Sequence, residues 1–225
     1  MIVAIDGPAG SGKSSTAKAA ARALGFLYLD TGALYRTVAL SLIDEGWPNR
    51  TLHALPQPFD LTLGHDRDGL LTLDLNGNDV TERIREPHVT SATSKIAALP
   101  WVRDALLDKQ REIAYGWTGK GGGVILDGRD IGTVVFPDAD LKLFLDADLD
   151  VRAERRFVEA VARGQDVTFD HVRNDLSERD HRDANRAVAP LKCAPDAVRV
   201  DTGVLSMEDQ VDLVVRLVEQ SREGD

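Results

Sequence analysis

Residues 7–14 read Gly7-Pro8-Ala9-Gly10-Ser11-Gly12-Lys13-Ser14. This stretch follows the apolar run 2–5 and precedes the alanine-rich segment 15–24, an order that predicts a strand, a glycine-rich loop and a helix. Glycines lack Cβ bulk, so successive backbone N–H groups can converge on one anion, and the helix N-terminus adds partial positive charge. The stretch therefore predicts a phosphate-binding loop, although glycine-rich turns also join strands to helices for packing reasons alone.

Two side chains of this loop suit a nucleoside triphosphate. In the pattern GxxxxGK[ST], the Lys13 ammonium reaches the β- and γ-phosphates, and the Ser14 hydroxyl ligates the Mg²⁺ that accompanies them. Ser14 is therefore the candidate metal ligand. The candidate ATP-binding set is Gly7, Pro8, Ala9, Gly10, Ser11, Gly12, Lys13, Ser14 and Ser15.

The composition is that of an ordinary globular chain. Its 225 residues suffice for one domain with an insertion, and 43% of them are hydrophobic and 28% charged. Apolar runs are too short to cross a bilayer, and the N-terminus enters a core strand at once, so we expect a cytoplasmic protein. The single cysteine, Cys193, excludes an intramolecular disulfide; packing explains it better than a nucleophilic role.

The net charge of −10 argues against nonspecific binding of nucleic acids or anionic membranes, but small anions can bind where basic groups converge. Eight arginines crowd one region of this otherwise acidic chain. Some of them can instead belong to solvated helices, paired at helical spacing with Glu154, Glu159 or Asp183. The eight are Arg152, Arg155, Arg156, Arg163, Arg173, Arg179, Arg182 and Arg186.

Short apolar runs alternate with helical patterns along the chain, which predicts an α/β fold with a parallel sheet and helices on both faces. The expected strands are residues 2–6, 27–30, 124–127, 141–146 and 198–201. The expected helices are residues 13–24, 33–45, 102–115, 149–162, 170–184 and 207–220. Each strand ends in an aspartate, and the carboxyl ends of parallel strands share one edge. We therefore expect Asp6, Asp30, Asp127, Asp146 and Asp201 along that edge.

Residues 59–99 interrupt this alternation. Leucines at 61, 63, 71, 73 and 75 alternate with other residues, and the pair Asn76-Gly77 is typical of a tight turn. A helical pattern follows near 90–98. We expect a small antiparallel insert between the prolines at 56 and 58 and Pro100.

A phosphate loop serves GTPases, ATPases and small-molecule kinases alike. The NKxD motif with which regulatory GTPases read guanine is absent, and transport or motor ATPases have larger chains. The stretches 30–36 and 127–130 each place an arginine near an expected glycine turn, suited to a second phosphate. These features favour a small-molecule kinase. The rivals are a kinase for UMP, AMP or a non-nucleotide acceptor, and a slowly hydrolysing regulatory module.

Four stretches together resemble the bacterial cytidylate kinases, a family of nucleoside monophosphate kinases, and the resemblance covers nearly the whole chain. They are residues 7–14, Asp30-Thr31-Gly32-Ala33-Leu34-Tyr35-Arg36, Asp127-Gly128-Arg129-Asp130-Ile131-Gly132-Thr133-Val134-Val135-Phe136-Pro137, and Arg182-Asp183-Ala184-Asn185-Arg186-Ala187-Val188-Ala189-Pro190-Leu191. The resemblance implies a single domain, residues 1–225, with a five-stranded P-loop NTPase-type core at about 1–30 and 104–225. It also implies a monophosphate-binding arm at about 31–103 and a short helical lid at about 149–168.

The resemblance further implies transfer of the γ-phosphoryl group of ATP to CMP or dCMP, with Mg²⁺, in pyrimidine nucleotide metabolism. The resemblance favours a monomer with ATP and CMP or dCMP as its partners, while the net charge is what argues against nucleic-acid and membrane partners. The family's roles carry over to matching positions. Arg36, Arg129 and Arg179 would hold the CMP phosphate; Ser94, Arg103 and Asp130 would read cytosine; Thr31, Asp183 and Arg186 would serve the sugar; and Asp127 completes the substrate set. Thr31 stands where many relatives have serine.

Two questions stay open at this point. Asp130 either accepts from the cytosine amino group or merely orients Arg129 through a salt bridge. In the lid, any one of Arg152, Arg155 and Arg156 can contact the transferring phosphoryl group. Their spacing places them on one helical face, so more than one of them can do so. The candidate catalytic set is Lys13, Arg129, Arg152, Arg155 and Arg156. A general base is not needed, because the attacking phosphate oxygen is already anionic.

Overall fold

The computed structural model describes residues 1–65 and 71–223. It divides into two compact units: unit 1 comprises Met1–Asp30 and Arg111–Asp225, and unit 2 comprises Thr31–Gln110. Unit 2 contains the whole of the segment that we predicted as an arm, residues 31–103. The two units are described separately below.

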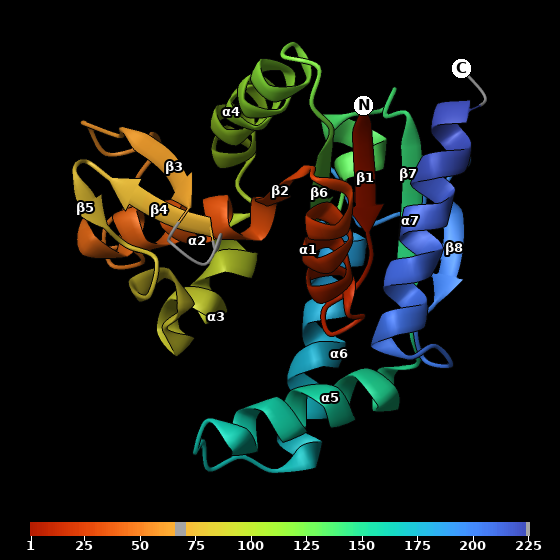
Figure 1. Cartoon of the computed structure of the whole chain (residues 1–225). Coiled ribbons are helices and arrows are strands. Elements are labelled where there is room, and N and C mark those ends of the chain that lie inside the picture. Colours follow the sequence, from red (N-terminus) through yellow and green to blue (C-terminus); the bar gives the residue numbers. More distant parts are fainter. Residues whose placement is uncertain (66–70, 224–225) are drawn as a thin grey trace. The chain divides into compact units, whose positions relative to one another are not determined.

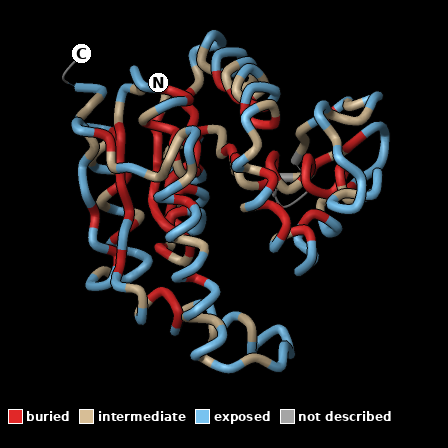
Figure 2. Tube along the Cα trace, turned by 180° about the vertical axis from the view of Figure 1, so that it is seen from behind, coloured by how far each residue is buried: buried red, intermediate tan, exposed pale blue. Residues whose placement is uncertain are grey.

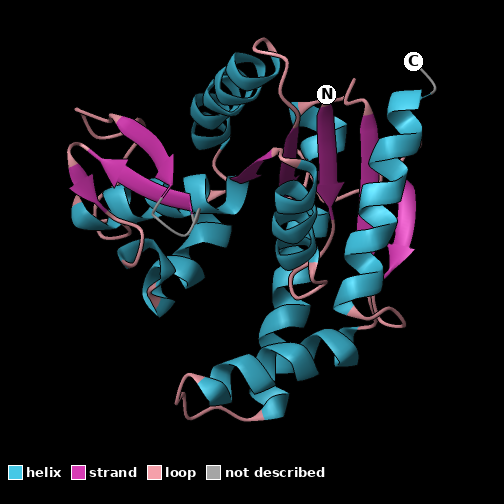
Figure 3. Ribbon diagram, in the orientation of Figure 1, coloured by secondary structure: helices cyan, strands magenta, loops and turns pink. Residues whose placement is uncertain are grey.

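Unit 1 is built on a five-stranded parallel sheet, which confirms the predicted fold class (Figure 3). The strands are β1 (Ile2–Asp6), β2 (Leu27–Asp30), β6 (Val124–Gly128), β7 (Leu141–Asp146) and β8 (Val198–Asp201), in the order β2-β6-β1-β7-β8. A central parallel strand is covered on both faces and therefore needs an apolar run. Val3, Ala4 and Ile5 of β1 are accordingly fully buried.

Helices cover this sheet. Those of unit 1 are α1 (Lys13–Leu24), α5 (Leu149–Ala162), α6 (Phe169–Asn185) and α7 (Met207–Glu223), together with the π-helical turn η2 (Ile131–Val135). Figure 1 shows α1 and α7 side by side in front of the sheet, with η2 behind β1. Small residues such as Ala17 and Ala20 bring α1 close to Ile125 and Leu145 of the sheet and to Val214 of α7. Within the described residues, no helix has both the length and the apolar character that crossing a membrane requires.

Parallel pairing places the five strand-end aspartates at one edge of the sheet, as predicted. In the register, Asp127 lies opposite both Ile5 and Asp30, and Asp146 lies opposite Asp201. Figure 2 shows that the buried parts of the chain follow the strands toward this edge. The same edge receives the glycine-rich loop that leaves β1.

Unit 2 contains the predicted antiparallel insert. Its elements are α2 (Thr31–Asp44), β3 (Leu61–His65), β4 (Leu71–Leu75), β5 (Asn78–Asp79), η1 (Arg83–Arg85), α3 (Pro87–Ile96) and the first part of α4 (Pro100–Thr118). The alternating leucines pair across β3 and β4, with Leu63 opposite Leu73. Asn76 and Gly77 both have positive φ, 56° and 80°, and form the tight turn into β5.

Some local predictions were wrong. The glycine turn expected after the second strand is absent, because α2 begins at Thr31 directly after β2 and takes Gly32 into its first turn. The helix expected at 90–98 begins earlier, at Pro87, a residue whose fixed φ suits the first turn of a helix. The short strand β5 and the turns η1 and η2 were not anticipated.

The buried face of the sheet should dominate the stability of unit 1. Ile125 is fully buried between β1 and β2, so Ile125→Ala should lower the free energy of unfolding by about 2–5 kcal/mol through the lost contacts and the cavity. Val204→Ala is the control, since Val204 is 81% exposed and its truncation should change stability by less than about 0.5 kcal/mol. Urea unfolding of the two variants measures the difference, and equal losses would contradict this description of the core.

Candidate functional site

The phosphate loop of unit 1 connects β1 to α1 in a backbone shape that requires glycine. Gly10 and Gly12 have φ of +78° and +84°, in the left-handed region that other residues rarely adopt. At Gly7, φ is +152°, and a Cβ atom would lie 2.0 Å from the carbonyl oxygen of Leu145 on β7. The loop therefore packs directly against the end of the neighbouring strand.

Lys13 is the buried cation of this loop. Its side chain is almost fully buried, and its ammonium donates to the Pro8 carbonyl oxygen at 3.0 Å. Burial, followed by the charges of Arg129, Arg179 and Arg156, holds the pKa of Lys13 well below its usual value, against the opposing charge of Asp127. A site with this surplus of positive charge is suited to a polyanion.

A buried carboxylate lies beside the first turn of α1. The Ser14 hydroxyl donates to Asp127 Oδ2 at 2.5 Å, and the Tyr28 hydroxyl donates to Oδ1 at 3.0 Å. Burial, and then the neighbouring Asp30 carboxylate, raise the pKa of Asp127. Tyr28 was missing from the predicted site. It lies two residues before Asp30 on β2, and an aromatic residue within a strand is normally predicted to belong to the hydrophobic core.

The donors around Ser14 fit magnesium. Hydroxyl and carboxylate oxygens are the hard ligands that Mg²⁺ accepts, and Ser14 and Asp127 offer both kinds of oxygen at the start of α1. Across residues 1–65 and 71–223, no group of three or more His, Cys, Asp or Glu side chains could form an all-protein cage. This arrangement suits an ion held between Ser14 and nucleotide phosphates.

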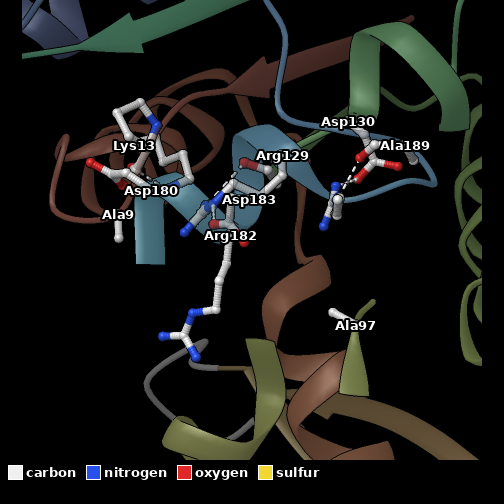
Figure 4. Close-up of polar contacts among 12 residues, drawn as sticks. Ala9, Lys13, Ala97, Arg129, Asp130, Asp180, Arg182, Asp183 and Ala189 are labelled. Carbon is white, nitrogen blue, oxygen red and sulfur yellow. Dashed lines mark hydrogen bonds and ion pairs between the residues drawn. The ribbon is translucent and has the colours of Figure 1, made fainter. Parts of the chain in front are cut away.

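The two most distinctive stretches of the sequence meet in unit 1 through ion pairs (Figure 4). Arg129 Nε donates to Asp183 Oδ2 at 2.8 Å, and Arg186 donates to Asp130 Oδ1 at 3.2 Å. Burial would raise the pKa of Asp183, but the Arg129 guanidinium, helped by Arg179 and Arg186, outweighs it and the pKa is lowered. These ion pairs connect the segment after β6 to the end of α6.

The three arginines that we predicted for a lid, here called the lid arginines, lie on α5 in different environments. Arg152 is buried and donates to the carbonyl oxygens of Ala9 and Ala147 and to Asp180 Oδ2, at 3.0, 2.8 and 2.6 Å. Arg155 donates to the Thr202 carbonyl oxygen at 2.6 Å.

Arg156 is half-exposed and pairs with Glu159 at 3.0 Å. Its charge nevertheless contributes to the lowered pKa of Lys13, and its side-chain stem passes close to Gly10. Arg156 therefore lies beside the phosphate loop, but the ion pair that it forms is exposed rather than buried.

Four predicted substrate residues lie in unit 2. Thr31 and Arg36 are on α2, Ser94 is on α3 and Arg103 is on α4. Arg103 is buried, donates to the Ala97 carbonyl oxygen at 3.2 Å, and has its guanidinium 5.5 Å from the centroid of the Tyr35 ring. The arginine is thus held within unit 2 by groups that were not in the predicted site. The roles of these four residues stay predictions.

A parallel sheet with a glycine loop after its first strand, a buried lysine and a serine at the start of the next helix defines a nucleotide-binding fold of the phosphate-binding-loop class. An uncharacterised protein from Eubacterium ventriosum has the same fold, with a TM-score of 0.55 at 14% identity over 98% of both chains. The family model for cytidylate kinase matches residues 3–220. The cytidylate kinase of Magnetococcus marinus is 45% identical over 219 residues, 97% of this chain and 95% of that protein. That of Solibacter usitatus is 44% identical, over 97% and 92%. The chain belongs to the cytidylate kinase family.

The phosphate loop should not tolerate a methyl group at Gly7. In Gly7→Ala, the new Cβ would overlap the Leu145 carbonyl oxygen, so the loop must shift, and we expect ATP affinity to fall at least about tenfold. Gly25→Ala is the matched control. Gly25 also has positive φ, 65°, at the other end of α1, but nothing lies within 4 Å of its added Cβ.

Gly25→Ala should therefore cost about 1 kcal/mol of stability and leave ATP affinity unchanged. Isothermal titration calorimetry with ATP and thermal unfolding of both variants separate the two effects. Unchanged ATP affinity in Gly7→Ala would contradict the proposed constraint.

Proposed function

We propose that this chain transfers the γ-phosphoryl group of ATP to CMP or dCMP, giving ADP and CDP or dCDP, by in-line transfer with Mg²⁺ and arginine stabilisation. The family match over residues 3–220 carries the proposal, and the phosphate loop with its buried Lys13 supports it. In such a reaction the protein forms no covalent bond, so positioning and charge neutralisation do the catalytic work.

On the donor side, the loop N–H groups and Lys13 bind the β- and γ-phosphates. A polyphosphate gives the Lys13 ammonium a charged acceptor in place of the Pro8 carbonyl oxygen. Ser14 would hold Mg²⁺, which supplies further neutralisation of the charge that develops between the phosphates. Asp127 orients the Ser14 hydroxyl.

On the acceptor side, Arg129, Arg179 and Arg36 bind the CMP phosphate. Arg129 receives its orientation from Asp183, a carboxylate whose low pKa keeps the pair charged. The attacking phosphate oxygen is anionic near neutral pH, so no general base is required. Thr31, Asp183 and Arg186 serve the sugar.

Cytosine recognition falls to Ser94, Arg103 and Asp130. Cytosine presents an exocyclic amino donor and ring acceptors, which a carboxylate or hydroxyl and a guanidinium complement. Uracil presents a carbonyl oxygen where cytosine has its amino group, so a buried carboxylate such as Asp130 opposes UMP. Mismatched polar groups of this kind discriminate more strongly than missing methylenes do.

Among the lid arginines, we assign the contact with the transferring phosphoryl group to Arg156. Arg152 and Arg155 donate to backbone carbonyls, whereas Arg156 forms an exposed ion pair with Glu159, which contributes little and is easily exchanged. Its position beside Gly10 keeps it within the electrostatic reach of Lys13.

If Arg156 contacts the phosphoryl group and Arg152 is structural, substituting the first should affect activity and substituting the second should affect stability. Arg156→Ala should lower kcat about 100-fold or more and change the free energy of unfolding by less than about 0.5 kcal/mol. Arg152→Ala, the matched variant, should lower that free energy by about 2–4 kcal/mol, because two carbonyl oxygens and Asp180 lose a buried donor. Steady-state kinetics and urea unfolding of both variants test it; an Arg156→Ala enzyme with normal kcat would rule it out.

The molecule that accepts the phosphoryl group distinguishes the candidate functions. With Mg·ATP, ADP should form rapidly with CMP and dCMP and slowly with UMP, because the Asp130 carboxylate suits an amino group and opposes a carbonyl oxygen. ADP should barely form without an acceptor or with AMP, whose purine is larger than the cytosine that the site is proposed to read. A coupled assay with all five conditions run in parallel measures this. A preference for AMP would support the assignment as a kinase but contradict the proposed cytosine site. ADP formation that ignores the acceptor would favour the regulatory module.

A further inference from the structure

Asp6 is a buried carboxylate to which the proposed mechanism gives no role. It is the last residue of β1, immediately before the phosphate loop, and is 4% exposed. Its Oδ1 accepts from the backbone N–H of Ile131 and its Oδ2 from that of Gly132, both at 2.8 Å. Those two residues directly follow Arg129 and Asp130.

The two N–H groups belong to the first turn of η2, where a helix cannot satisfy them internally. Inside η2, the N–H groups of Val134 and Val135 donate to the Asp130 carbonyl oxygen, at 2.9 and 3.1 Å. An aspartate at the position of Asp130 ordinarily caps such a turn with its own side chain. Here the Asp130 side chain makes no capping hydrogen bond and instead accepts from Arg186.

Gly132 makes this arrangement possible. A Cβ atom at Gly132 would lie 3.2 Å from Cδ of Lys142 and 3.5 Å from Oδ2 of Asp6. The missing Cβ of Gly132 thus leaves room beside the turn for both the Asp6 carboxylate and the Lys142 stem. The pairing of β1 with β6 sets Asp6 opposite Gly128, the residue before Arg129.

We propose that Asp6 is a positioning residue, which caps η2 in place of Asp130 and thereby keeps the Asp130 carboxylate turned toward Arg186 and the acceptor base. This inference rests on the proposed function, because it concerns the residue that reads cytosine. An aspartate at the N-cap ordinarily accepts from N–H groups of the first turn, so without the cap from Asp6 the Asp130 carboxylate would be drawn to the N–H groups of η2. Asp6 therefore determines base selectivity without touching the substrate.

Asp6→Asn tests the proposal with the least change in shape. One amide oxygen replaces two carboxylate oxygens, so one of the two N–H groups faces another donor. We expect the ratio of kcat/KM for CMP to kcat/KM for UMP to fall roughly tenfold or more. The reason is that the Asp130 carboxylate then rotates to cap η2 and no longer faces the acceptor base. ATP affinity, measured by calorimetry without acceptor, should stay within about threefold of wild type.

Asp196→Asn is the matched control. Asp196 accepts from the Lys142 ammonium at 2.6 Å, and that ammonium also donates to the Pro137 carbonyl oxygen at the end of the same segment. This variant removes a carboxylate that braces the segment from its other end and should leave the CMP to UMP ratio unchanged. Equal changes of the ratio in both variants, or an unchanged ratio in Asp6→Asn, would overturn the proposal.

A double-mutant cycle tests the link to Asp130. Asp130→Asn should itself lower the CMP to UMP ratio, and adding Asp6→Asn should lower it no further. Independent, multiplying effects would refute the capping mechanism. A wild-type enzyme without preference for CMP would refute both the proposed function and this inference. If the wild type prefers CMP over UMP and the Asp6→Asn variant prefers it equally, this inference alone is refuted.

The wild-type enzyme provides a second test, which holds even if Asp6→Asn fails to fold. Burial, partly opposed by the two backbone N–H donors, raises the pKa of Asp6 to about 6. The charges that face it are Asp130, which raises this pKa, and Arg129, which lowers it; the stem of Lys142 also packs near Gly132. Protonation converts one oxygen from an acceptor to a donor.

The phosphates of CMP and UMP ionise alike, so their titration cancels in the ratio of the two kcat/KM values. Between about pH 8 and about pH 5, we expect the CMP to UMP ratio to fall with a midpoint at about pH 6. A ratio that stays constant across this range would overturn the proposal.

Discussion

The site in unit 1 depends on the contact between the phosphate loop and the carboxyl end of β7. At Gly7 the loop backbone approaches Leu145 so closely that no side chain fits, and Arg152 joins the carbonyl oxygens of Ala9 and Ala147 across the same junction. The loop is therefore shaped by its protein surroundings before any phosphate binds. Preorganised N–H donors of this kind bind an anion without the cost of ordering a flexible loop.

That fixed shape brings opposite charges into a buried space. Burial lowers the pKa of Lys13 and raises that of Asp127, so each is less readily charged than in water. A bound polyphosphate would add negative charge beside Lys13, and a magnesium ion held by Ser14 would add positive charge near Asp127. The proposed ligand thus relieves both unfavourable charges at once, which gives a physical reason for the two to be used together.

The sequence predicted the parallel sheet, its acidic edge and the leucine hairpin, because each follows from local periodicity or from turn residues. It could not resolve the three lid arginines, since Arg152, Arg155 and Arg156 share a helix and differ only in the tertiary groups that they meet. Tyr28 and Tyr35 were missed for the same reason. Their contacts with Asp127 and Arg103 join elements that are distant in the sequence, and an aromatic residue carries no local mark of such a role.

The strand-end aspartates illustrate how position in the sheet, rather than residue type, decides what a carboxylate does. Asp6 is the last residue of β1 and Asp127 the last but one of the adjacent central strand β6. Both are nearly fully buried and bind groups far away in the sequence. Asp146 and Asp201 end β7 and β8, are exposed, and accept from the nearby N–H groups of Ala147 and Gly203. The chain leaves β1 between β6 and β7, where the order of an open sheet reverses and ligands collect. A carboxylate at that point is buried by the loops that bind the ligand, and so it must be paired with them.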